Sequence, residues 1–448
     1  MNTSFLGGLV FVVVFAGIIL LHEIGHFSVA RLFKFDVEEF GFGLPPRLRR
    51  LWRAKGWIVV GKERLALPLN FDLPFDHKTH LHHPVVVEAA LLRGQLTVQS
   101  ITLAATEDGQ YRPDASTQRE QLPNGATRLT GILDEAHPGT EFTLNWIPLG
   151  GFNKFPGEDN PDLPGGLASA NPWKRILVLL AGAAMNLLTG VLVYTVIFSQ
   201  WGIPDQHTAM IAAVNEGSPA LQAGILPGDI VTSAGGIAVT GTDHLIAITY
   251  DNLGVPLTLN ILREGEALEI TVTPRADPPE GEGPMGISIG NPIEPAKTWF
   301  HTLPISFASV GRDINNLLSL PGRLIAGTLS SQEAQMGGPR TIWNLFQQSV
   351  ARDVSSRQTE AATGTAPTNY TLLIIISLTV TVAVANLLPI PALDGGRIFM
   401  SLIEVVTRRR IPANYQMAIN GVSYIILLLL LGFFYIKDFI NPVVITLP

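Results

Sequence analysis

Residues 5–30 read FLGGLVFVVVFAGIILLHEIGHFSVA, an apolar run that ends in HEIGH at residues 22–26. No charged side chain occurs in residues 1–21, and roughly 20 apolar residues let a helix cross about 30 Å of hydrocarbon. A cleaved signal peptide is the alternative. It is disfavoured because no Lys or Arg precedes the run and no small-residue cleavage site ends it. We therefore predict a first transmembrane helix over this stretch.

The rest of the chain contains three more apolar segments of similar length, at residues 176–201, 372–388 and 419–436. Hydrophobic residues make up 47% of the 448 residues and charged residues only 15%, a balance typical of a protein that lies partly in lipid. The predicted fold class is therefore a polytopic α-helical membrane protein with about four transmembrane helices.

The charge and the cysteine content exclude several kinds of site. A formal net charge of −7 argues against a general nucleic-acid binder, which needs a basic face, so we expect no nucleic-acid partner. The chain has no Cys, which excludes disulfides, thiolate zinc ligands and Cys nucleophiles. Any bound metal must therefore be held by His and carboxylate side chains.

The basic residues predict how the chain crosses the bilayer. They form three groups, after the first span, before the second, and between the third and the fourth: Arg31, Lys34, Arg47, Arg49, Arg50, Arg53 and Lys55; Lys174 and Arg175; Arg397, Arg408, Arg409 and Arg410. All three groups fall on one side of a four-span protein, and the positive-inside rule makes that side cytoplasmic. The N-terminus, residues 202–370 and the C-terminus are then extracytoplasmic.

The polar end of the first apolar run predicts a metal site. His22 and His26 are four residues apart, so both imidazoles lie on one helical face and can reach one Zn²⁺, with Glu23 beside the metal as a base. The alternative is a polar helix end at the cytoplasmic interface. It is weakened because the motif continues an apolar helix, where ionisable groups are costly and usually functional.

Asp394 is the candidate for a third ligand. Zinc in hydrolases usually takes three protein ligands, and Asp394 lies in NLLPIPALDGGR, residues 386–397, just after the third apolar segment. The two prolines of this stretch break a helix and free backbone groups, which lipid tolerates only where they line a cavity or meet a partner. Considered alone, Asp394 could also be part of a turn at the membrane edge.

Together these motifs resemble the site-2 protease family and, within it, the bacterial RseP-type regulatory proteases. HEIGH in the first span, Asn-x-x-Pro-x-Pro-x-Leu-Asp-Gly-Gly after a later span and a module between them carry the resemblance, which covers most of residues 1–64 and 141–448. The resemblance implies zinc as the cofactor and the following roles: His22, His26 and Asp394 hold zinc; Glu23 is the catalytic base; Asn386, Pro389 and Pro391 line the substrate cleft; Asn186 is a packing or cleft residue; and strands at about 58–64 and 141–152, with Gly150 and Gly151, pair with the unwound substrate.

Two regions outside the spans are predicted to fold as β-containing modules. Residues 208–275 combine turn signals with strand-like runs at 229–233, 256–263 and 267–274, and they resemble a PDZ module, which binds peptide C-termini or extended peptides at a sheet edge. A membrane-associated β-hairpin region on the cytoplasmic side is expected to carry a β-rich insert at about 65–140. The Ser, Thr, Ala and Gly content of residues 351–369 indicates a linker.

These predictions divide the chain into six parts. They are 1–37, the first transmembrane helix with the zinc motif; 38–172, the cytoplasmic β region with its insert; 173–201, the second transmembrane helix; 202–295, an extracytoplasmic PDZ domain; 296–370, an extracytoplasmic helical segment and linker; and 371–448, the third and fourth transmembrane helices with the third zinc ligand.

The function predicted on this basis is that of an intramembrane zinc metalloendopeptidase of the bacterial plasma (inner) membrane. The resemblance implies regulated intramembrane proteolysis of single-pass membrane protein substrates, such as anti-sigma factors or remnant signal peptides. The alternative is a catalytically silent membrane scaffold that displays a PDZ module, although such a relative would be expected to lose Glu23 or a ligand. A metal transporter is a third reading, but the repeated polar spans of many transporters are lacking.

Overall fold

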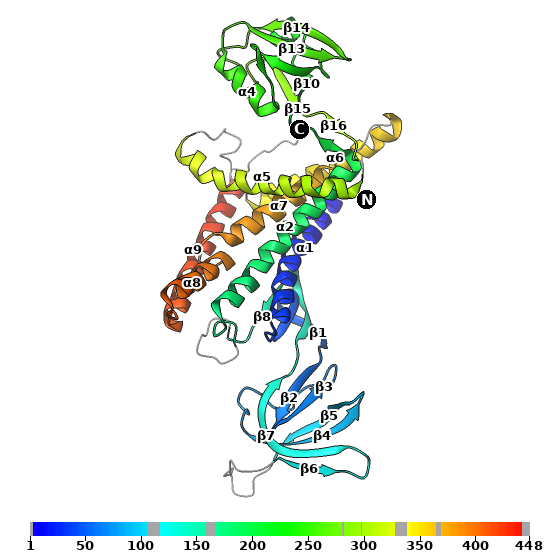
Figure 1. The fold of residues 1–448 in the computed structure, drawn as a ribbon, viewed down its shortest axis with the longest axis vertical. Helices are drawn as coiled ribbons and strands as arrows, with labels where there is room; N and C mark the ends of the chain where they lie inside the picture. The colour runs from blue at the N-terminus through cyan, green and yellow to red at the C-terminus, as the bar shows by residue number, and fades with distance from the viewer. Residues whose placement is uncertain are drawn as a thin grey trace. The chain divides into compact units, whose positions relative to one another are not determined.

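The computed structural model describes residues 3–104, 117–157, 166–279, 282–296, 298–327, 338–363 and 369–440. The chain divides into two compact units (Figure 1). The first consists of Met1–Gly190, Val310–Ala362 and Asn369–Pro448, and the second of Val191–Ser309 and Thr363–Thr368. Each unit is described by itself below.

Four helices in the described part of the chain are long and apolar enough to cross a membrane. They are α1 (Thr3–Leu32), α2 (Pro172–Trp201), α7 (Tyr370–Leu387) and α9 (Ala413–Ile440). Their bounds contain the four predicted apolar segments to within one residue. The prediction of about four membrane helices is therefore confirmed by length and composition.

Two long strands in the first unit, β1 (Glu39–Arg53) and β8 (Glu141–Lys154), pair as a two-stranded sheet of irregular register (Figure 1). Residues 39–42 pair with 151–154 and also with 141–144, and residues 47–53 pair with 141–145. Residues 39–42 are thus hydrogen-bonded along both edges. By contrast, residues 151–154 have a strand partner along one edge only, within the part of the chain that the structure describes.

The segment between β1 and β8 folds as a six-stranded sheet with a core of its own. Its strands are β2 (Gly56–Val60), β3 (Glu63–Leu67), β4 (Pro84–Leu92), β5 (Gln95–Leu103), β6 (Gln118–Gln121) and β7 (Thr127–His137). Alternate residues of β4 and β7 are buried, which is the period of two expected of a strand with one face on a core. We call this element the insert sheet.

The insert sheet corrects one prediction and shifts a boundary. Residues 58–64 were expected to pair with substrate, but β2 is hydrogen-bonded to β3 on one side and to β7 on the other, so this prediction is wrong. The insert also begins at Gly56 rather than near residue 65, because β2 closes the same core as β7. Residues 105–116 of the predicted insert lie outside the described residues.

The second unit contains a sheet of strand order β14-β13-β11-β10-β15, with β12 paired to β11. Its elements are β9 (Ile203–Pro204), β10 (Ala209–Val214), α3 (Pro219–Gln222), β11 (Ile230–Ala234), β12 (Ile237–Ala238), α4 (Thr242–Asp251), β13 (Leu257–Arg263), β14 (Glu266–Val272), β15 (Ile287–Gly290) and β16 (Ile293–Glu294). The three strand-like runs predicted for residues 208–275 coincide with β11, β13 and β14, which confirms a compact α/β module there.

A buried ion pair ties the start of β11 to the end of β13 in this module. The Asp229 carboxylate accepts bonds of 2.7 Å each from Nε and Nη2 of Arg263, and one of 2.8 Å from the backbone N–H of Leu226. Burial raises the pKa of Asp229, but the bonds from Arg263 and Leu226 outweigh burial and hold the pKa below its ordinary value. Asp229 therefore stabilises the fold of the module.

Three more helices complete the described chain: α5 (Trp299–Ile325), α6 (Pro339–Thr363) and α8 (Asp394–Thr407). Helix α6 corrects the prediction of a linker at 351–369, since residues 351–363 are helical. Ala has the highest helix propensity and Ser and Thr lower it only modestly, and here the buried Phe346 and Val350 anchor the helix. Residues 364–368 lie outside the described part of the chain.

Candidate metal centre

The structure brings together the three side chains that the sequence proposed as metal ligands. His22 Nε2 lies 2.9 Å from Asp394 Oδ2, His26 Nε2 lies 3.3 Å from the same oxygen, and the two Nε2 atoms are 3.0 Å apart. The His residues lie on α1 and the carboxylate 368 to 372 residues later at the start of α8, and all three are buried or nearly so. Among the residues described, no other group of three His, Asp or Glu side chains converges in this way.

The donor atoms fit a tetrahedral metal ion. Ligand atoms at 2.0–2.1 Å from zinc stand about 3.3 Å apart in a tetrahedron, so the observed separations need to widen by only a few tenths of an ångström. His26 Nδ1 donates a hydrogen bond of 2.8 Å to the carbonyl oxygen of Val178. This bond fixes the tautomer that leaves Nε2 free to coordinate, the arrangement usual for metal-binding histidines. Two neutral imidazoles and one carboxylate are a donor set typical of hydrolytic zinc.

Two glycines make room for the imidazoles. A Cβ on Gly182 of α2 would lie 2.4 Å from His26 Nε2 and 2.7 Å from His22 Cε1. A Cβ on Gly25 would lie 2.3 Å from the carbonyl oxygen of Ala181. Helices α1 and α2 therefore approach closely at the motif, and the backbone of α2 forms one wall of the centre.

The bend after α7 places Asp394. The helix ends at Leu387, and the prolines at 389 and 391 prevent its continuation. Added Cβ atoms on Gly395 and Gly396 would lie 2.2 Å from the Leu388 carbonyl oxygen and 2.3 Å from the Ile390 carbonyl oxygen. Only glycine lets the first turn of α8 fold back onto the bend, and that fold directs Asp394 toward α1.

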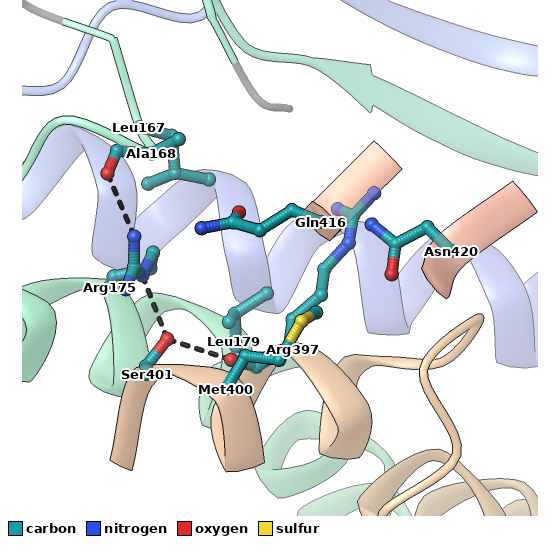
Figure 2. Close-up of a pocket in the computed structure, with 9 residues that line it drawn as sticks. All are labelled: Leu167, Ala168, Arg175, Leu179, Arg397, Met400, Ser401, Gln416 and Asn420. Atoms are coloured by element: carbon teal, nitrogen blue, oxygen red, sulfur yellow. Dashed lines mark hydrogen bonds between the residues drawn. The ribbon is translucent and has the colours of Figure 1, made fainter. Parts of the chain in front are cut away.

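A buried ion pair anchors the far end of α8 to the start of α2. Arg175 bonds to the Glu404 carboxylate. Figure 2 shows its other two bonds, of 2.8 Å each, which it donates to Ser401 Oγ and to the Ala168 carbonyl oxygen. Glu404 also accepts a bond of 3.2 Å from Gln416 of α9. Arg175, Ser401 and Gln416 are among the residues that line a cavity of about 20 Å³, which has room for one water molecule. From the sequence, Arg175 was expected only to mark the cytoplasmic end of the second span.

A larger cavity of about 320 Å³ opens beside the three ligands. Glu23, Asn153 and Asn386 contribute polar groups to it, while most other walls are apolar, including Ile19 and Phe152. Asn153 Nδ2 donates a bond of 2.7 Å to Glu23 Oε2, so strand β8 reaches the residue proposed as base. The arrangement places a carboxylate, a trio of metal-binding groups and space for a peptide in one site.

The residues predicted to bind substrate fall in different places. Asn386 lines the cavity, and its amide lies 3.3 Å from His22 Nε2. Pro389 and Pro391 are not among the lining residues described and shape the bend instead. Gly150 and Gly151 pack against α1, where added Cβ atoms would lie 2.3 Å from Ile19 and 3.1 Å from Leu20. The close approach of β8 to α1 therefore explains why both positions are glycine.

Two residues were missed although the sequence carried a signal for each. Asn153 directly follows the apolar and glycine-rich stretch LGGF, and Gly182 lies in the small-residue run AGAAM of an apolar helix. Asn186, expected as a packing or cleft residue, is fully buried and its carbonyl oxygen accepts a bond of 3.4 Å from Thr379 of α7. Its side-chain amide is buried without a hydrogen-bond partner among the described residues, and Asn186 does not line the described cavity, so the structure places it among packed side chains and not in the cleft.

Comparison with known proteins places most of the chain in one family. The family model described as Peptidase family M50 matches residues 10–59 and 129–430, and the part of the chain it skips is most of the insert sheet. A Clostridium perfringens protein that carries a zinc-metalloprotease name is 32% identical over 305 residues, which cover 68% of this chain and 85% of that protein. Metalloprotease MmpA of Caulobacter vibrioides is 26% identical over 314 residues, 62% of this chain and 77% of that protein.

A search of solved structures also gave matches. The PDZ domain of the SdrC-like protein of Listeria monocytogenes is 18% identical, with a TM-score of 0.17, and the match covers 19% of this chain and 90% of that domain.

Proposed function

The chain belongs to peptidase family M50, the site-2 proteases, and is a membrane zinc metalloprotease; we propose that it hydrolyses peptide bonds within transmembrane segments of other proteins. The observation that carries this proposal is the position of the centre. Two ligands and Glu23 belong to α1, which is long and apolar enough to span a membrane. A site built into such a helix is best placed to act on chains that are themselves in the bilayer.

In this proposal His22, His26 and Asp394 hold zinc. When bound, the ion would polarise the scissile carbonyl and lower the pKa of a coordinated water molecule, so that a nucleophile can form at neutral pH. Val178 keeps His26 in the coordinating tautomer through its carbonyl oxygen, and Gly182 leaves the space that the two imidazoles occupy.

Glu23 is the proposed catalytic base. It lines the cavity next to the three ligands, where its carboxylate would take a proton from the attacking water and then return it to the leaving amine. Proton transfer by a positioned side chain typically contributes roughly 10²–10⁴-fold to a rate.

The substrate must be extended at the point of cleavage. A helix hides its carbonyl groups in intrahelical bonds, so it has to unwind before water can attack. Residues 151–154 of β8 have one edge without a strand partner among the described residues, and Asn153 of this segment bonds to Glu23. Gly150 and Gly151 keep this edge close to α1. The unwound segment would add to this edge, with Asn386 on the opposite wall and Pro389 and Pro391 holding that wall in place.

The β1–β8 sheet is the proposed membrane-associated hairpin. Both strands expose large apolar side chains: Leu44, Leu48, Leu51, Trp52, Leu144, Trp146 and Ile147. An exposed apolar surface of this kind is costly in water and is suited to contact with lipid. This supports a sheet that dips toward the bilayer at the site.

The remaining assignments follow from the charge pattern and from the family. The termini and the second unit would be extracytoplasmic at the bacterial plasma membrane, and the second unit would act as a PDZ domain for extended peptides or peptide C-termini. Single-pass membrane proteins, of the anti-sigma-factor or remnant signal peptide kind, would be cleaved in regulated intramembrane proteolysis.

The proposal is tested with a membrane-anchored reporter whose transmembrane segment contains a helix-breaking Asn-Pro pair. Glu23→Gln should abolish cleavage and leave zinc bound, because an amide cannot accept the proton but does not disturb the ligands. Normal cleavage by Glu23→Gln would sink the assignment of the base. A wild-type chain that binds zinc but cleaves no membrane segment would favour the scaffold that displays a PDZ module.

A further inference from the structure

Asn153 of β8 contacts Glu23 twice. Its Nδ2 lies 2.7 Å from Glu23 Oε2 and 2.7 Å from the Glu23 backbone oxygen. Because a carbonyl oxygen can only accept a hydrogen bond, the amide nitrogen must face Glu23, and this settles an orientation that an isolated Asn leaves open. Both N–H groups of the amide are therefore donated to one residue of α1.

This orientation of the amide lowers the stability of the fold, so packing alone does not explain why Asn153 adopts it. Asn153 Oδ1 is buried and has no hydrogen-bond partner among the described residues. A buried acceptor without a partner is destabilising, and an apolar side chain of similar size would fill the same space without that cost. Departures of this kind from good packing are expected where a side chain serves the chemistry of a site.

Asn153 is also the one side chain in the described structure that hydrogen-bonds to the Glu23 carboxylate. The side chain of a glutamate has three rotatable bonds, and without a partner it populates several rotamers. A base transfers a proton efficiently only when it is held within hydrogen-bond reach of that proton.

We infer that Asn153 is a positioning residue for Glu23, which holds the carboxylate at the cavity and couples it to the strand edge 151–154. The inference rests on the proposed function, because it has meaning only if Glu23 is the base. It adds that the strand proposed to receive substrate also orients the base that takes the proton of the attacking water.

Two variants and one control test this inference in the purified, zinc-loaded full-length chain. Asn153→Leu keeps a similar volume and removes both donors, whereas Asn153→Asp keeps the shape and turns acceptors toward Glu23. Gln95→Leu is the control: it removes a similar amide from an exposed position of the insert sheet, outside the cavity and outside the strand edge 151–154. The substrate is a quenched fluorescent transmembrane peptide with a central Asn-Pro pair.

The expected result is a fall in kcat of roughly 10²-fold for Asn153→Leu, with KM and zinc content as in the wild type. The kcat of Asn153→Asp should fall at least as far, and Gln95→Leu should match the wild type. A kcat equal to the wild type in both Asn153 variants would overturn the inference, as would a loss that appears in KM or zinc content alone. If Asn153→Leu fails to fold, the isosteric Asn153→Asp decides.

The two proposals fail in distinguishable ways. If the wild type shows no cleavage that depends on Glu23, the proposed function is wrong and the inference falls with it. If the wild type cleaves and both Asn153 variants cleave at its rate, only the inference is wrong.

Discussion

The insert sheet and the candidate metal centre belong to the same compact unit but are stabilised in different ways. The insert sheet has a core of Val, Leu and Ile side chains from alternate strand positions, such as Val85, Val87 and Leu129. In the metal centre, buried polar side chains meet between helices that glycines allow to approach closely. Many sequences can satisfy an alternating core, whereas few can satisfy a site in which polar side chains from distant segments must meet at hydrogen-bond distance.

The family comparison follows the same division. The M50 model matches both sides of the insert and omits residues 60–128. Single substitutions at the metal centre should therefore have large effects on zinc binding and cleavage, whereas changes in the insert should be tolerated. The predictions below test this contrast, in order of their expected effect on zinc binding and cleavage.

The largest effect is expected from Asp394→Ala. This variant removes one of three ligands and leaves two imidazoles, which do not complete a zinc site. Zinc content, measured by metal analysis after dialysis, should fall well below one ion per chain, and cleavage should drop below detection. Prolonged treatment of the wild type with a strong chelator should reproduce the loss, and added Zn²⁺ should restore only the wild type. Full zinc content in Asp394→Ala would contradict the ligand assignment.

A smaller effect is expected from a single methyl group on α2. Gly182→Ala would place Cβ 2.4 Å from His26 Nε2, so the imidazoles must shift. A disturbance of this kind next to a metal ligand typically lowers metal affinity roughly 10–100-fold. Gly17→Ala on α1 is the matched control, since its Cβ meets no atom within 4 Å. Equal zinc affinity in the two variants, measured by competition with a chromophoric chelator, would show that α2 is not a wall of the centre.

Next comes the ion pair that anchors α8. Arg175→Met leaves Glu404 as an uncompensated buried charge, which typically lowers the free energy of unfolding by about 3–5 kcal/mol. Thermal melting in detergent should show this loss, while zinc binding at low temperature should remain, because Asp394 is also held by the glycine contacts at the other end of α8. Arg175→Met combined with Glu404→Met should recover much of the stability. A double variant as unstable as the single one would argue against the pair as the cause.

The parts that could be predicted from the sequence are those with a local pattern. The four spans follow from uninterrupted apolar runs, the strands at 229–233 and 256–263 follow from turn signals, and the pairing of His22 with His26 follows from helix periodicity. Asp394 needed a second motif with its own signature. Each of these is a property of a short window of sequence.

The parts that could not be predicted depend on which segments meet in space. The bond from Asn153 to Glu23 joins residues 130 positions apart, and the Arg175–Glu404 pair joins residues 229 apart. Residues 58–64 look like a free strand in sequence, but β7 covers the open edge of β2. Residues 351–363 look like a linker because their composition is polar, whereas the helix depends on contacts made earlier in α6.

The smallest effect is expected from removing the insert sheet. Its ends are already adjacent, since the backbone N–H of Ala54 donates a bond of 2.8 Å to the Thr140 carbonyl oxygen. Replacing residues 56–138 by Asn-Gly should therefore close β1 and β8 as a hairpin with a two-residue turn. The bridges lost, such as Lys78 to Glu38, are partly exposed pairs that contribute only about 0–1 kcal/mol each.

In this shortened chain the four groups of the site keep their neighbours. Within the described residues their hydrogen bonds go to residues outside β2 to β7, and the cavity is lined by residues outside these strands. Zinc content and cleavage of the transmembrane peptide should both stay close to those of the full chain. A chain that keeps its zinc but loses cleavage would break the contrast between the two regions. It would mean that the insert sheet takes part in admitting or unwinding the substrate, and that the omission of this region from the family model marks a specialised function.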